Sequence, residues 1–282
     1  LFFENQLRVS QGKDALDYLF SRGISEGSIK HFRIGFSPRG RDSLKAALAL
    51  GGISDDLMIE AGLLIKPDDH AQSPYDRFRG RVMFPIADRR KRIIAFGGRV
   101  LGDGEPKYLN SPETPLFLKG NNLYALPQAI EAARGGETIL VTEGYTDVIA
   151  LHQAGFKNAV APLGTALTEN QMRLLWRNVS EPILCFDGDG AGQKAARRAA
   201  ERAMPLLKPG KSLRFITLPN GQDPDSLVKT NGVEAVRTIL DASVPLFEIV
   251  WQYNTHGCRL ETPEDRAGLE SRLKQLAHSI ED

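Results

Sequence analysis

The second half of the chain alternates short apolar runs with stretches that have helical spacing. The apolar runs have the length and β-branched content of buried strands. The stretches between them end at Gly or Pro, which are common helix stop signals. We expect strands at 138–142, 158–163, 182–186 and 212–218, and helices at 145–154, 168–177 and 190–204. This β-α-β-α-β-α-β series predicts a parallel, doubly wound α/β sheet.

The first half has a different pattern. Helical spacing predicts helices within 14–22 and 25–31, and two more within 41–64. Apolar runs at 81–88 and 92–99 predict strands on either side of a polar turn. Residues 102–122 are rich in Gly, Pro and Asn, which is typical of an irregular loop.

These changes in pattern divide the chain into three predicted parts. We expect an N-terminal α/β subdomain over 1–134, the regular α/β domain over 135–225, and a helical subdomain over 226–282. The fold class is therefore α/β, and mixed α+β overall. Because the chain begins at Leu1 in a segment that reads as helical, we expect it to be a piece of a longer protein.

Composition narrows the possible functions only slightly. The chain has 282 residues and a net charge of +1, so nucleic acid could be bound only by local basic clusters. Its two cysteines, Cys185 and Cys258, have no zinc-ligand spacing, so we expect no zinc in this piece. No apolar run reaches membrane-spanning length, and no signal peptide is visible, so we expect a cytoplasmic protein without a membrane partner.

Acidic residues gather where three of the predicted strands end. Because ligands of an open α/β sheet bind outside the carboxyl ends of its strands, we expect these acids at one edge. Their mutual repulsion indicates a divalent cation, and oxygen ligands without His or Cys favour Mg²⁺, with Mn²⁺ as a possible substitute. An acid in a strand-to-helix loop is otherwise usually a helix cap, as we interpret Asp147. The five candidate catalytic acids are Glu143, Asp187, Asp189, Asp223 and Asp225.

Basic residues upstream of the acids suggest phosphate binding. Arg77, Arg79 and Arg81 alternate, so in an extended strand they would share one face and could form a phosphate track. The alternative is an ordinary solvated strand face.

The Gly-rich loops that follow suit a nucleotide. Arg99, Lys107 and Lys119 lie in or beside these loops, where they could contact a triphosphate. Tyr108 offers a ring that could stack on a base or sugar, or could equally anchor the loop.

Taken with their order along the chain, these motifs closely resemble the RNA polymerase core of bacterial DnaG-type primases. The resemblance covers nearly the whole chain. Among the matching segments are YLFSRGIS (18–25), RFRGRVMFPI (77–86), PKYLNSPET (106–114), TEGYTDV (142–148), FDGDGAGQKAA (186–196) and GQDPDSL (221–227).

The resemblance implies a TOPRIM fold for residues 135–225 and Mg²⁺-dependent synthesis of RNA primers on single-stranded DNA from ribonucleoside triphosphates. It implies a metal site formed by Glu143, Asp187, Asp189 and Asp225, assisted by Asp223. It also implies a replicative helicase as partner, through a domain outside this piece, and a location at the replication fork or nucleoid. The implied nucleotide-binding residues are Arg22, Arg99, Lys107, Tyr108 and Lys119, and the implied template-binding residues are Arg77, Arg79 and Arg81.

Three other protein classes share some of these features. A DNA-cleaving TOPRIM enzyme, such as a topoisomerase or nuclease, typically reads DxDxEG, whereas Ala191 stands in DGDGAG here. A haloacid-dehalogenase-like phosphatase has its DxD after an early strand, whereas here Glu143 precedes the DxD. A non-catalytic nucleic-acid-binding module would gain nothing from five acids beside phosphates.

Overall fold

The computed structural model describes residues 1–69, 71–164, 166–257 and 260–280. The chain divides into two compact units, Leu1–Pro127 and Gln128–Asp282. The predicted subdomain boundary at 225 falls inside a helix of the second unit, Pro224–Asp241. The three-part division therefore stays a prediction.

The first unit contains a four-stranded antiparallel sheet with the order β1-β4-β5-β6. Strands β4 and β5 are the two predicted from the apolar runs, joined by the predicted polar turn. Helix α1 packs on β1, and Phe3, Phe78 and Met83 belong to one buried cluster. The elements of this unit are α1 (Phe2–Arg8), η1 (Ser10–Gly12), α2 (Lys13–Ser21), α3 (Glu26–His31), β1 (Gly35–Ser37), α4 (Ser43–Leu50), α5 (Asp55–Glu60), β2 (Leu64–Ile65), β3 (Tyr75–Asp76), β4 (Arg81–Ala87), β5 (Ile93–Val100), β6 (Tyr108–Asn110) and η2 (Lys119–Asn121).

One part of the predicted 102–122 loop is a strand. Residues 108–110 form β6 and pair with β5, with Arg99 opposite Tyr108. The local Gly and Pro content gave no sign of this strand, because an edge strand this short is formed by its partner rather than by its own sequence.

The second unit contains the predicted parallel sheet. Strands β8, β7, β9 and β10 are parallel neighbours, and a short antiparallel strand, β11, adds an edge that the sequence pattern did not predict. The elements of this unit, from the helix that leads into it, are α6 (Leu126–Arg134), β7 (Leu140–Val141), α7 (Tyr145–Gln153), β8 (Ala159–Val160), α8 (Glu169–Trp176), β9 (Ile183–Phe186), α9 (Gly190–Ala203), η3 (Met204–Leu206), β10 (Arg214–Thr217), α10 (Pro224–Asp241), β11 (Val244–Pro245), α11 (Leu246–Thr255) and α12 (Pro263–His278).

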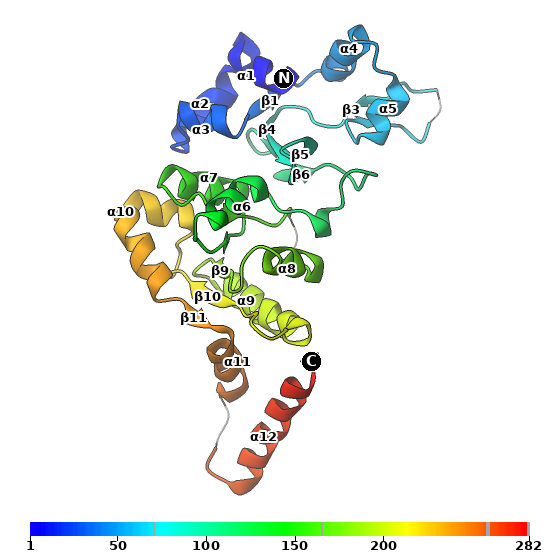
Figure 1. Ribbon diagram of the computed structural model, residues 1–282. Helices are drawn as coiled ribbons and strands as arrows, with labels where there is room; N and C mark the ends of the chain where they lie inside the picture. The colour runs from blue at the N-terminus through cyan, green and yellow to red at the C-terminus, as the bar shows by residue number, and fades with distance from the viewer. Residues whose placement is uncertain (70, 165, 258–259, 281–282) are drawn as a thin grey trace. The chain divides into compact units, whose positions relative to one another are not determined.

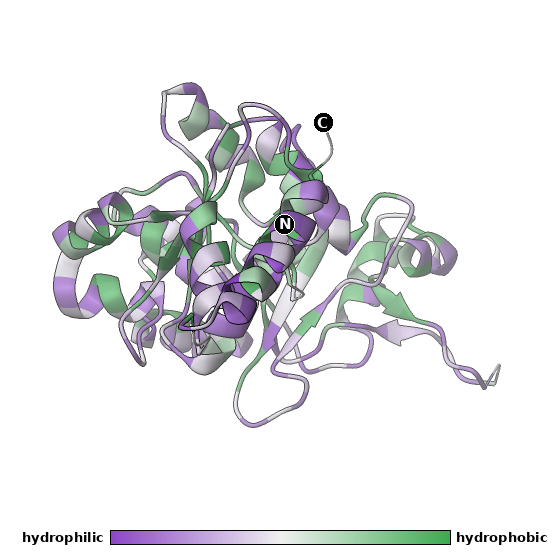
Figure 2. Cartoon of the chain, turned by 90° about the horizontal axis from the view of Figure 1, so that it is seen from below, coloured by the Kyte–Doolittle hydropathy of each residue, from purple (hydrophilic) through white to green (hydrophobic). Residues whose placement is uncertain are grey.

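Helices cover both faces of this sheet, as the alternating pattern predicts. Leu140 and Cys185 face α7 and α10, whereas their neighbours Val141 and Leu184 face α9. This is the period of two expected of strands buried on both sides. The two helical layers can be followed in Figure 1, and Figure 2 shows that the helices carry both hydrophilic and hydrophobic residues.

Local signals place the helix ends. Thr168 caps α8 in a capping box with Gln171, which confirms the predicted N-cap. Gly155 follows α7 with a φ of 101°, a conformation that glycine adopts without steric cost.

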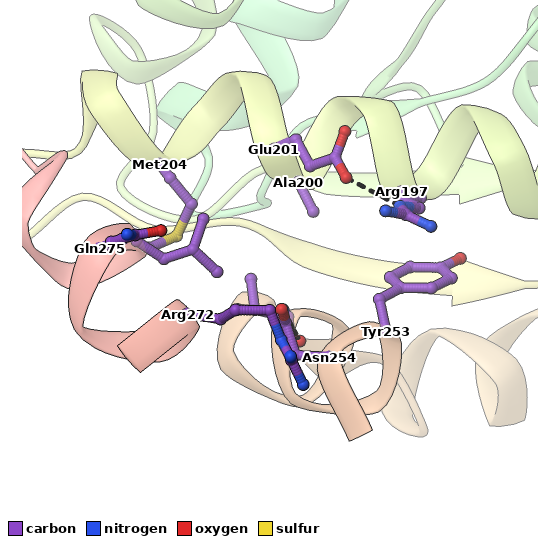
Figure 3. Close-up of a pocket in the computed structure, with 10 residues that line it drawn as sticks. Arg197, Ala200, Glu201, Met204, Tyr253, Asn254, Arg272 and Gln275 are labelled. Carbon is purple, nitrogen blue, oxygen red and sulfur yellow. Dashed lines mark hydrogen bonds and ion pairs between the residues drawn. The ribbon is translucent and has the colours of Figure 1, made fainter. Parts of the chain in front are cut away.

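Helix α11 packs on α9, and α12 packs on α11. Between α9, α11 and α12 lies a cavity of about 300 Å³, and the residues that line it are drawn in Figure 3. On its α9 side, Arg197 forms an ion pair with Glu201 at 2.8 Å and lies over the ring of Tyr253. Among the residues that the structure describes, no helix combines the length and hydropathy needed to span a bilayer.

Candidate active site

Three adjacent parallel strands deliver the acidic clusters to one edge of the sheet. The strand order is β10-β9-β7, and the clusters follow these three strands in the sequence. The backbone N–H of Asp187 donates to Oε1 of Glu143 at 3.2 Å, which ties the first cluster to the second. The structure therefore brings together acids that are far apart in sequence.

The pKa of Asp187 shows the effect of this crowding. Burial, followed by the charges of Glu143, Asp223 and Asp189, raises its pKa from 3.8 to about 7. Its Oδ1 atom is buried and has no hydrogen-bond partner among the described residues. An unsatisfied carboxylate oxygen among like charges is suited to a cation.

Asp189 and Asp223 each begin a helix. Oδ1 of Asp189 accepts the N–H groups of Ala191 and Gly192 at 2.9 and 2.7 Å, at the start of α9. Asp223 forms a capping box with Ser226 at the start of α10. Capping fixes the orientation of both carboxylates at the sheet edge, because each helix begins there.

Asp225 is buried and already has a cationic partner. Its Oδ2 lies 2.7 Å from Nζ of Lys229, one turn later on α10. Lys229 therefore offsets part of the negative charge of the acidic cluster.

Asp147 is a sixth acid at this edge that the sequence reasoning assigned only to capping. It does accept the N–H of Gly144, but it is only 7% exposed. Burial, then the charges of Asp223, Asp187 and Asp225, raises its pKa well above the usual range. The available signal was its position in the first turn of α7, because a helix that follows β7 begins at the edge of the sheet where the acids gather.

The acids suit a divalent cation whose remaining coordination positions would be filled by other ligands. Within residues 1–69, 71–164, 166–257 and 260–280, no three His, Cys, Asp or Glu side chains are placed to hold an ion by themselves. Mg²⁺ commonly keeps several waters and is bound by one or two carboxylates together with phosphate oxygens. The donor set suits an ion of that kind, because it offers only carboxylate oxygens.

Most of the predicted nucleotide-binding residues lie close together in the first unit. The guanidinium of Arg99 lies 4.3 Å from the ring centre of Tyr18, and Arg99 pairs across the sheet with Tyr108. Arg22 is one turn from Tyr18, just after α2, and Lys107 immediately precedes β6. Lys119 lies apart from them in sequence, in η2.

The three arginines of the predicted phosphate track do not form one exposed row. Strand β4 begins only at Arg81, and Gly80 has a φ of 60°, so the extended geometry assumed from the sequence is wrong. Arg81 is buried and donates to the carbonyls of Gly98 and Pro106. Arg77 donates to the carbonyl of Asn110, which leaves Arg79 as the exposed member.

Arg79 has basic neighbours that the alternating pattern did not include. Arg41 and Arg79 both lie over the ring of Tyr75, at 4.2 and 5.1 Å. Arg39 joins Arg79 in lining a cavity of about 490 Å³. Arg39, Arg41 and Arg79 form a basic surface. This surface is a stronger candidate for phosphate contacts than the strand face predicted from the alternating arginines.

Known proteins match both units of the chain. Residues 2–130 match the family described as DNA primase catalytic core, N-terminal domain, and residues 137–217 match the Toprim domain. A DNA primase domain from Pseudomonas aeruginosa has a similar structure, with a TM-score of 0.92 and 47% identity over 99% of this chain and 87% of that one. The chain belongs to the DnaG primase family.

Other primases show the same relationship. The DNA primase of Pseudomonas aeruginosa is 51% identical over 95% of this chain and 40% of its own length. A DnaG primase catalytic domain bound to ssDNA has a TM-score of 0.90 and 42% identity, over 99% of this chain and 87% of that one. The chain thus spans less than half the length of the curated primases that it matches.

Membership of the DnaG primase family bears on the alternatives. It confirms the resemblance seen in the sequence, and it removes the topoisomerase and phosphatase alternatives. A Toprim domain in a primase implies that a divalent metal binds.

Proposed function

We propose that this chain is a primase catalytic core that synthesises short RNA primers on single-stranded DNA by Mg²⁺-dependent nucleotidyl transfer. The observation that carries the proposal is the acidic edge, where Asp187 has a buried oxygen without a hydrogen-bond partner and a pKa raised to about 7. Relatives named DNA primase, including one bound to ssDNA, support it.

The acids have distinct roles in this proposal. Glu143, Asp187 and Asp189 would hold Mg²⁺, and Asp225 would join them with its charge offset by Lys229. Asp223 and Asp147 add negative charge beside them. Bound Mg²⁺ would supply a lowered pKa at the primer 3′-hydroxyl and charge stabilisation for the leaving pyrophosphate.

In this proposal, basic residues of the first unit would bind the nucleotide and the template. Arg22, Arg99, Lys107 and Lys119 would offset the triphosphate charge, and Tyr108 would stack on the nucleotide. Arg79, with Arg39 and Arg41 beside it, would contact the template phosphates. Arg77 and Arg81 would contribute by shaping this surface, because their guanidiniums already bind backbone carbonyls.

Removing either central acid tests the proposal. With single-stranded DNA, labelled ribonucleoside triphosphates and Mg²⁺, Glu143→Gln and Asp187→Asn should each lower primer synthesis by at least about 100-fold, because charge stabilisation of the reacting phosphate is lost. Glu169→Gln is the control, because Glu169 is an exposed acid in the first turn of α8.

The outcomes are distinct. Near-normal synthesis by either variant would contradict the assignment of the acids. Wild-type protein that binds DNA but makes no RNA would favour a non-catalytic module. The expected helicase contact and the expected lack of zinc stay predictions.

A further inference from the structure

A second cavity lies against the acidic edge, on the α9 face of the sheet. It has a volume of about 350 Å³, and Glu143 is part of its lining. Ala191, Ala195 and Ala199 form the α9 wall, and their spacing of four places them along one ridge of the helix. Because none of these side chains extends beyond Cβ, the helix leaves room beside the sheet.

The walls and the far end of this cavity differ in chemistry. Val141, Leu184 and Leu167 are among the apolar lining residues. Arg198 and Arg202 lie further along α9, and Arg198 is about 10 Å along the helix from Ala191. The cavity therefore has a carboxylate at one end, apolar sides, and guanidinium groups at the other.

The two arginines are not equally available. Arg202 donates a hydrogen bond to the carbonyl of Leu167. Arg198 is exposed and has no ion pair or hydrogen bond within the described residues. Its neighbour Arg197, on another face of the same helix, is paired with Glu201 beside the cavity of Figure 3.

We propose that this cavity binds the 3′-terminal nucleotide of the growing RNA strand, with Arg198 on its phosphodiester. The apolar walls suit a base and ribose, and the Glu143 end would place the 3′-hydroxyl beside the acids. One guanidinium without a partner matches the single charge of a phosphodiester better than the several charges of a triphosphate. This inference rests on the proposed function, and it adds a site for the primer end.

Kinetics with a preformed primer test the site. On a complementary template, the KM for a ribodinucleotide primer should rise about tenfold in Arg198→Ala, because a charge-assisted hydrogen bond is lost. The KM for the incoming triphosphate should not change. Arg197→Ala is the matched control and should leave both values unchanged. Ala195→Leu, which fills the cavity, should also raise the KM for the dinucleotide.

Equal kinetics for Arg198→Ala and Arg197→Ala would overturn the inference. So would a rise confined to the KM for the triphosphate. Melting temperatures close to that of the wild type would show that the variants are folded.

A binding measurement separates this site from the proposed activity. Fluorescence anisotropy with a labelled RNA–DNA duplex that has a recessed RNA 3′ end, in EDTA, should show weaker binding to Arg198→Ala only. If the wild type makes no primers but this difference is present, the primer-end site stands and the proposed function fails. If the difference is absent, or if adenosine 5′-monophosphate binds as tightly as the duplex, the primer-end site is wrong.

Discussion

Asp187 binds a proton at a higher pH than an ordinary aspartate, because it is buried among other acids. Its pKa of about 7 means that, between about pH 4 and pH 7, the folded chain holds a proton that the unfolded chain has lost. Stability from this group is therefore present at low pH and is lost as the pH rises through 7. A cation beside the carboxylate would reverse that loss.

The first prediction concerns the effect of Mg²⁺ on stability. Added Mg²⁺ should raise the melting temperature at about pH 8 by a few °C, and by less at about pH 5, because repulsion at the site is greatest when Asp187 is ionised. Asp187→Asn should be more stable than the wild type at about pH 8 without Mg²⁺ and should gain less from adding it. Thermal unfolding followed by circular dichroism would measure both effects.

Glu169→Gln serves as the reference for this series, because Glu169 is exposed and pairs with Arg173 rather than with the acidic clusters. An equal Mg²⁺ effect in Asp187→Asn and the wild type would show that no cation binds beside Asp187.

At the scale of elements, the loop between β9 and α9 brings the acids close to the neighbouring backbone. A Cβ on Gly188 would lie 1.9 Å from the carbonyl oxygen of Pro219, whereas a Cβ on Gly190 would meet nothing within 4 Å. Gly188 therefore lets the turn after β9 approach the turn after β10. That approach helps to hold Asp187 near Asp223.

Substitution of these two glycines gives the second prediction. Gly188→Ala should destabilise the fold by about 1–3 kcal/mol and sharply reduce primer synthesis, because the two turns must separate. Gly190→Ala, two residues away, should retain both stability and activity. Urea unfolding with a primer assay would compare them, and equal behaviour of the two variants would contradict this account of the loop.

For the whole molecule, a net charge of +1 leaves DNA binding to local surfaces. The basic surface of Arg39, Arg41 and Arg79 provides three candidate phosphate contacts. Binding should therefore depend only moderately on salt, unlike that of a strongly basic protein.

This is the third prediction. A plot of log binding constant against log salt for single-stranded DNA should have a slope of about −2, since each phosphate contact contributes about −0.7. Arg79→Ala should reduce the magnitude of the slope by about 0.7. Lys157→Ala removes a basic residue outside the basic surface and should leave the slope unchanged. A slope that Arg79→Ala does not alter would exclude this surface as the DNA contact.

The sequence by itself determined the class of fold and the edge that carries the acids. Strand and helix periods, together with Gly and Pro stop signals, are local properties, so β7 to β10 and their helices could be predicted. The carboxyl ends of parallel strands lie at one edge of a sheet. The grouping of Glu143, Asp187 and Asp223 could therefore be predicted from the sequence. The family resemblance rested on the same local motifs.

Only the tertiary structure decided which groups are buried and which remain available. Asp147 lies beside the candidate catalytic acids because α7 packs against α10. Arg81 is buried because its guanidinium donates to a carbonyl of β5. The cavity beside Glu143 exists because the small residues of α9 face the strand ends. Each of these depends on contacts between segments distant in sequence, which the hydrophobic periodicity within one segment cannot show.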